Sequence, residues 1–271
     1  MTRSTITGPS TESLPGELLE GPVPAWVDLG ADLWGFGGLH GGLSLSLLTA
    51  AMHERVPDRR LRQVTGQFHR AVRGPFALEV TEERIGRTAT SLSARAIDGA
   101  STLLSASAVF AGAVGGIGVD GTFSPSAPPA PPPEDCPVFT IPPEFVPFAR
   151  HTEIRPVGPA RPFTGADEPE LVAWLRLAGD ETPPDETRLV VLMDSLAPSY
   201  AAVLTAPVPI PTVALSVRPG PALAEASSPW VLLRARTLTA TADGWVDEAL
   251  DAWAPDGSHL GSGHQLRLVT G

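Results

Sequence analysis

The sequence contains no lysine, because all 19 of its basic residues are arginine. Without lysine there can be no Schiff-base nucleophile, no anchor for pyridoxal phosphate and no phosphate-binding lysine of a P-loop. Cysteine is nearly absent too: Cys136 is the only one in 271 residues, which excludes an internal disulfide framework and a cysteine-rich metal site. The chemistry of this chain must therefore come from other side chains or from the backbone.

Positive charge and long apolar runs are also scarce. The net charge is −11 and the pI is near 4.9, whereas binding to nucleic acid needs a basic surface. No stretch approaches the ~20 uninterrupted apolar residues of a membrane span, and the first residues lack the apolar core of a signal peptide. We therefore expect a cytoplasmic protein with neither nucleic acid nor membrane as a partner. The composition, rich in Ala, Arg and Pro, favours a bacterial source.

Proline and glycine, by contrast, are abundant, with 30 and 27 residues. They gather between Ala111 and Pro147, and proline fits neither the interior of a helix nor a central strand. This composition predicts an extended, semi-rigid linker rather than a single long surface loop within one domain. The expected organisation is a flexible N-terminal segment (1–20), an N-terminal unit (21–113), a linker (114–147) and a C-terminal unit (148–271).

The two units show the same order of elements, which predicts a duplicated α+β fold. The first unit has a short strand at Ala25–Leu29 and an apolar, glycine-led helix at Gly41–Met52. Four further strands are expected at Leu61–Val72, Phe76–Ile85, Thr88–Ile97 and Ser101–Phe110. The second unit has a strand at Glu170–Leu177 and a helix at Asp185–Leu204, with Asp185 as N-cap. Its later strands are expected at Pro211–Arg218, Trp230–Ala240, Gly244–Trp253 and Leu260–Val269. Two such units joined edge to edge would share a continuous sheet.

Several short segments, taken in order, carry a resemblance to a known family. They are Gly37–Gly42, Phe68–Val72, Gly86–Thr88, Pro133–Cys136, Leu192–Asp194, Pro211–Ser216 and Gly263–Leu266. Together they resemble the double-hotdog acyl-CoA thioesterases of the thioesterase II family, particularly its bacterial thioesterase-like branch. The resemblance implies a double hotdog, in which two antiparallel sheets are each wrapped on a central helix. It also implies a homodimer.

Asp194 is the first candidate site residue. It is expected in an apolar helix, where a carboxylate is costly unless it is paired. The resemblance implies that it is the base that activates water; otherwise it is a solvent-facing or structural carboxylate bonded to Ser195 or Ser199. Thr212 and Gln265 match the family's other two polar positions, and a hydroxyl and an amide can both hold water. Without the resemblance, Thr212 could be an ordinary strand residue and Gln265 an outward-facing polar residue.

Gly41 and Gly42 begin the first helix, where backbone N–H groups are unpaired. The resemblance implies that these amides form an oxyanion hole facing Asp194, which gives one composite site per chain. The alternative is that the glycines only permit tight packing. His40 resembles the histidine of a single-hotdog branch, but the acidic residue expected nine positions later is Thr49 here. His40 could therefore polarise a carbonyl, bind water or only cap the helix.

Other chemistry finds no support in the sequence. The remaining histidines lack metal-ligand spacing, Gly-x-Ser-x-Gly is absent, and the carboxylates at Glu82–Glu83 and Asp247–Glu248 are expected to be solvated. We therefore expect no metal and no cofactor. The leading hypothesis is a thioesterase acting on an acyl-CoA or a carrier-bound acyl group. The alternatives are a hotdog dehydratase, hydratase or cyclase acting on a polyketide-type intermediate, and a non-catalytic acyl-binding module.

Overall fold

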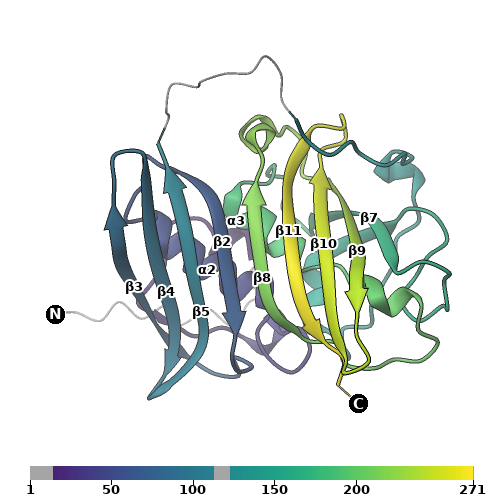
Figure 1. Ribbon diagram of the computed structural model, residues 1–271, viewed down its shortest axis with the longest axis horizontal. Coiled ribbons are helices and arrows are strands. Elements are labelled where there is room, and N and C mark those ends of the chain that lie inside the picture. Colours follow the sequence, from purple (N-terminus) through teal and green to yellow (C-terminus); the bar gives the residue numbers. More distant parts are fainter. Residues whose placement is uncertain (1–14, 113–122, 271) are drawn as a thin grey trace.

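The computed structural model describes residues 15–112 and 123–270. Within them, one 11-stranded sheet has the order β1-β3-β4-β5-β2-β8-β11-β10-β9-β7-β6, and neighbouring strands are antiparallel throughout (Figure 1). The first half of the chain supplies β1 (Trp26–Val27), β2 (Arg60–Phe68), β3 (Phe76–Ile85), β4 (Ala89–Asp98) and β5 (Ser101–Ala111). The second half supplies β6 (Thr152–Pro156), β7 (Glu170–Leu177), β8 (Thr212–Pro219), β9 (Val231–Ala240), β10 (Trp245–Trp253) and β11 (His259–Leu268).

The two halves meet where β2 pairs with β8. Thr65 lies opposite Ser216, and the Thr65 hydroxyl donates to that of Ser216 at 3.0 Å. The chain therefore has one continuous sheet, as expected for two units joined edge to edge, and not the two sheets that the resemblance implies. The physical reason is that β2 and β8 would each leave a row of unpaired backbone groups at the edge of its own half, and pairing removes both edges.

Two buried helices cover one face of this sheet and lie side by side, behind the strands in Figure 1. Helix α2 (Gly41–His53) packs on β2 to β5, and α3 (Glu186–Met193) packs on β7 and β8. The helices are antiparallel, since the start of α2 contacts the end of α3 and the Ser46 hydroxyl donates to the Thr187 carbonyl at 2.8 Å. Both helices are apolar on most sides, as expected for helices enclosed in a core. The short helices are α1 (Pro15–Leu18) and the 3₁₀ turns η1 (Ala31–Leu33), η2 (Pro133–Asp135), η3 (Pro147–His151), η4 (Ser199–Ala202) and η5 (Pro221–Glu225).

Helix α3 is shorter than predicted. Its start is confirmed, because the Asp185 carboxylate accepts hydrogen bonds from the Thr187 and Arg188 amides at 2.9 and 2.7 Å. The predicted end at Leu204 is wrong: α3 ends at Met193, and a separate 3₁₀ turn follows. Pro198 prevents the helix from continuing to Leu204, since it has no N–H to continue the helix and disfavours helical geometry in the residue before it.

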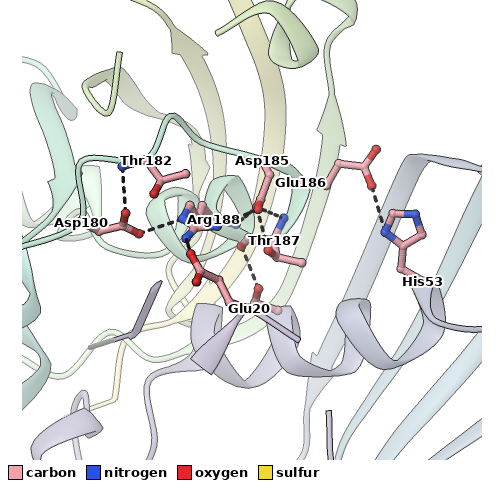
Figure 2. A network of polar contacts seen from close by, with 9 residues as sticks. Glu20, His53, Asp180, Thr182, Asp185, Glu186, Thr187 and Arg188 are labelled. Carbon is pink, nitrogen blue, oxygen red and sulfur yellow. Dashed lines mark hydrogen bonds and ion pairs between the residues drawn. The ribbon is translucent and has the colours of Figure 1, made fainter. Parts of the chain in front are cut away.

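A buried arginine secures the beginning of α3. Figure 2 shows the Arg188 guanidinium between the carboxylates of Glu20, Asp180 and Asp185, with N–O distances of 2.9, 2.8 and 2.8 Å. These groups come from the segment after α1, the turn after β7 and the cap of α3. The side chain of Arg188 thus ties three parts of the chain together, and its carboxylate partners compensate its burial.

The proline-rich segment from residue 123 onward packs on the other face of the sheet. The indole N–H groups of Trp174 and Trp253 donate to the carbonyls of Pro131 and Pro125, each at 2.9 Å. Both indoles are buried in a small cluster with Cys136 and Leu232, apart from the main core around the helices. We call residues 123–136 the proline strap. Residues 1–14 and 113–122, which belong to the predicted N-terminal segment and linker, lie outside the described residues.

We expect Trp174→Phe to lower the free energy of unfolding by about 1 kcal/mol or more. The change removes the hydrogen bond to Pro131 and leaves space beside the strap. Urea unfolding measures the change, with Trp26→Phe at a half-exposed indole as the control. Equal stability of the two variants would contradict this role of the strap contact.

Asp251 lies on the strap side of the sheet among three donors. Arg234 Nη2 contacts it at 3.0 Å, the Ser262 hydroxyl donates to it at 2.8 Å, and His259 Nε2 lies 3.7 Å away. Burial alone would raise the pKa of Asp251, but these three partners outweigh it and lower the pKa to about 2. The guanidinium of Arg234 also lies over the Trp253 ring, 5.2 Å from its centre.

We expect Asp251→Asn to lose about 2 kcal/mol of stability at neutral pH. Folding lowers the pKa of Asp251 from 3.8 to about 2, so its ionised form stabilises the fold above about pH 4, and that gain disappears as the pH falls toward 2. Urea unfolding of wild type and variant between pH 7 and about 3 should therefore show converging stabilities. A constant difference over this range, or an equal loss in the exposed-turn control Asp98→Asn, would contradict the assignment.

Candidate active site

Asp194 lies where the two helices meet. It caps the C-terminus of α3 rather than lying within the helix, and its side chain is only 9% exposed. Its Oδ2 accepts a hydrogen bond from the backbone N–H of Gly42 at 2.7 Å, in the first turn of α2. The unpaired amides and the partial positive charge at the start of a helix favour a carboxylate in this position.

The glycines at the start of α2 are required by this close approach. A Cβ on Gly41 would lie 2.7 Å from Asp194 Oδ2, and one on Gly42 would lie 2.8 Å from Asp194 Cβ and 3.0 Å from the carbonyl oxygens of Val190 and Val191. A side chain at Gly42 would press on backbone oxygens, whereas one at Gly41 would press on the side chains of Asp194 and Phe68. The structure thus shows the tight packing that the sequence offered as one role of these glycines, and their role as an oxyanion hole stays a prediction.

Gln265 and Thr212 complete the surroundings of the carboxylate. The Gln265 Nε2 group donates to Asp194 Oδ1 at 2.6 Å, and the Thr212 hydroxyl donates to the same oxygen at 3.4 Å. Gln265 faces the helices from β11, and Thr212 begins the neighbouring strand β8. The structure therefore brings Asp194, Gln265, Thr212 and the N-terminus of α2 together, although these residues are far apart in the sequence.

His40 is the N-cap of α2 and lies against the same carboxylate. Its Nδ1 accepts from the Leu43 amide at 3.2 Å, so Nε2 carries the proton and donates to the Asp194 carbonyl at 3.1 Å. The ring is buried and stacks on Phe148 with centroids 3.9 Å apart. Burial lowers the pKa of His40 below its usual 6.5, although Asp194 acts in the opposite direction. His40 is therefore neutral at pH 7, and it caps the helix while holding the backbone of Asp194.

A buried ion pair that the sequence did not predict lies behind Gln265 and Thr212. Arg267 Nη1 donates to the Thr212 hydroxyl at 2.8 Å, Nη2 donates to Gln265 Oε1, and Nε donates to Glu248 Oε2 at 2.7 Å. Glu248 is 0% exposed, so the expectation that it is solvated is wrong. The sequence held a signal for this burial. Because alternate residues of a strand point to the same face, Glu248 shares a face with the apolar Val246 and Leu250, and Arg267 shares a face with Gln265.

Among the described residues, there is no group of three or more His, Cys, Asp or Glu residues placed to hold a metal ion. Within the same part of the chain, no helix is long and apolar enough to cross a membrane.

Comparison with known families gives two matches that together span most of the chain. Residues 31–111 match the model of an acyl-CoA thioesterase N-terminal domain. Residues 133–269, about half of the chain, match the model of an acyl-CoA thioesterase C-terminal domain. Among curated proteins, no sequence matches.

Solved structures share the fold. A conserved protein of unknown function with a hot dog fold from Alicyclobacillus acidocaldarius is 23% identical, with a TM-score of 0.79 over 91% of this chain and 92% of that one. A tesB protein of Mycobacterium avium subsp. paratuberculosis is 18% identical, with a TM-score of 0.74 over 96% and 100%. An acyl-CoA thioesterase II, TesB2, of Mycobacterium marinum is 19% identical, with a TM-score of 0.67 over 85% and 88%. At these identities the likeness shows a hotdog fold.

We expect Gly42→Ala to destabilise the protein by about 1 to 3 kcal/mol, because the added Cβ has no room between the two helices. Gly74→Ala is the matched control, since a Cβ there meets nothing within 4 Å, and it should change stability by less than about 1 kcal/mol. Urea unfolding of both variants measures the difference. If both behave alike, the close approach of the helices is not a constraint on the fold.

Proposed function

The chain belongs to the acyl-CoA thioesterase family, and on that premise we propose that it hydrolyses an acyl-CoA or carrier-bound acyl thioester with water activated by Asp194. The observation that carries the proposal is the meeting of a buried carboxylate, two side-chain donors and the start of a helix at one point. Thioester hydrolysis needs this combination: a base for water, groups that orient it, and donors for the oxyanion that develops.

In the proposed reaction, Asp194 accepts a proton from a water molecule while the water oxygen attacks the thioester carbonyl carbon. The carbonyl oxygen takes up negative charge in the tetrahedral intermediate. When the intermediate collapses, the C–S bond breaks, and the leaving thiolate takes the proton from Asp194. Gln265 and Thr212 hold the water and the carboxylate in line, so that the products are a carboxylic acid and a free thiol.

The two amides at the start of α2 have different roles in this proposal. The Gly42 N–H already donates to Asp194 Oδ2, whereas the Gly41 N–H has no acceptor among the described residues. We therefore assign the oxyanion contact to Gly41 rather than to both glycines. His40, neutral and bonded to the Asp194 carbonyl, holds the base in place and does not itself supply a positive charge.

The finer organisation is part of the same proposal. We propose that each half, 21–113 and 148–271, is one hotdog unit around its central helix, with the linker 114–147 between them. The site is then composite, since the first unit supplies the helix amides and the second supplies the carboxylate. Assembly as a homodimer and a cytoplasmic location stay predictions.

The direct test is thiol release from acyl-CoAs of different chain length by the purified protein. We expect Asp194→Asn to lower kcat by about 10²- to 10⁴-fold, the usual contribution of a general base. Asp185→Asn at the opposite end of α3 is the control and should keep its activity, because Asn is an equally good N-cap.

Wild-type rates in Asp194→Asn, or no turnover of any thioester tested, would contradict the proposal. Tight acyl-CoA binding without turnover would instead identify an acyl-binding module, and conversion of the acyl group without thiol release would identify a hotdog dehydratase, hydratase or cyclase.

A further inference from the structure

We propose that Arg267, held in place by Glu248, is a positioning residue that fixes the direction in which Gln265 and Thr212 donate their hydrogen bonds. Its effect on rate rests on the proposed function, but its effect on these side chains does not. Neither Arg267 nor Glu248 donates to Asp194, so both act on the site through other groups.

The orientation of the Gln265 amide shows this most clearly. An amide has an accepting end and a donating end of nearly equal shape, so packing alone hardly distinguishes the two orientations. A guanidinium only donates. Because Arg267 Nη2 contacts Gln265 Oε1, the Nε2 end must face Asp194 Oδ1, at 2.6 Å. A flipped amide would place N–H against guanidinium and oxygen against carboxylate, two repulsive contacts in a buried site.

The Thr212 hydroxyl is directed in the same way. It accepts from Arg267 Nη1 at 2.8 Å, so its own proton is free to point toward Asp194 Oδ1, 3.4 Å away. The two side chains that Arg267 contacts, Gln265 and Thr212, therefore both donate to the same oxygen, Asp194 Oδ1. Asp194 is thereby kept as an acceptor, as a base must be before it takes a proton from water.

Glu248 explains why Arg267 can occupy this position. Arg267 is 5% exposed and Glu248 is 0% exposed, so each would be costly without the other. The second carboxylate oxygen of Glu248 accepts from the Ser199 amide at 2.5 Å, at the start of η4. A pair of apolar residues could fill this space without the cost of burying two charges, whereas only the charged pair orients Gln265 and Thr212.

Arg267→Lys tests the proposal, because one ammonium group cannot reproduce the planar fork that contacts Glu248, Thr212 and Gln265 together. We expect kcat to fall about tenfold with little change in KM. In a background of Gln265→Ala with Thr212→Val, the same substitution should change kcat by less than about twofold, since the groups it orients are gone.

Arg188→Lys is the matched control, because Arg188 is also a buried arginine with three carboxylate partners but lies at the far end of α3. It should change kcat by the same small factor in both backgrounds. An equal fall of kcat for Arg267→Lys in both backgrounds would overturn the proposal and assign Arg267 a purely structural role.

A second measurement needs no turnover. The side-chain amide protons of Gln265, identified by their loss in Gln265→Ala, should exchange slowly with solvent in wild type. They should exchange at least about tenfold faster in Arg267→Met with Glu248→Met, a pair that removes both buried charges together and so favours folding. Unchanged exchange in that folded double variant would overturn the positioning role. If wild type releases no thiol, the proposed function fails, while the exchange result still decides this inference.

Discussion

The hydrogen bond from the Gly42 amide to Asp194 is the contact around which the molecule is arranged. It forms where α2 and α3 lie side by side and antiparallel, so that the start of α2 meets the end of α3, and the absence of a side chain at Gly41 and Gly42 permits this. The pairing of β2 with β8 places both helices beneath one sheet, so that each half contributes one side of the contact. The Asp194 carboxylate, at the C-terminus of α3, is thereby stabilised by the N-terminus of α2.

Two buried arginines show how the second half tolerates charge in its interior. Arg188 joins the segment after α1 to the cap of α3, and its partners make it a structural tie. Arg267 has one carboxylate partner, Glu248, and its remaining donors go to Gln265 and Thr212. The same residue type thus secures the fold at one end of α3 and orders the site at the other.

Much of the fold could be predicted from the sequence, because alternating polar and apolar residues indicate strands and longer apolar runs indicate buried helices. The resemblance also selected Asp194, Gln265 and Thr212, which the structure brings together. The end of α3 was missed although Asp194, Ser195 and Pro198 interrupt the apolar run after Met193. The pairing of Glu248 with Arg267 could not be predicted, because the strand period places Glu248 on the face of Val246 and Leu250 but does not show which residue of another strand lies near it. That depends on the register of β8, β10 and β11.

The central claim is that water activated by Asp194 attacks a thioester whose oxygen contacts the start of α2. A crystal structure with a ketone analogue of acyl-CoA, in which CH₂ replaces the sulfur, tests it most directly. The account predicts the ketone oxygen about 3 Å from the Gly41 nitrogen, and a water bonded to Asp194 on the line of attack at the carbonyl carbon. A ketone bound away from α2, or in direct contact with Asp194 with no water between them, would contradict it.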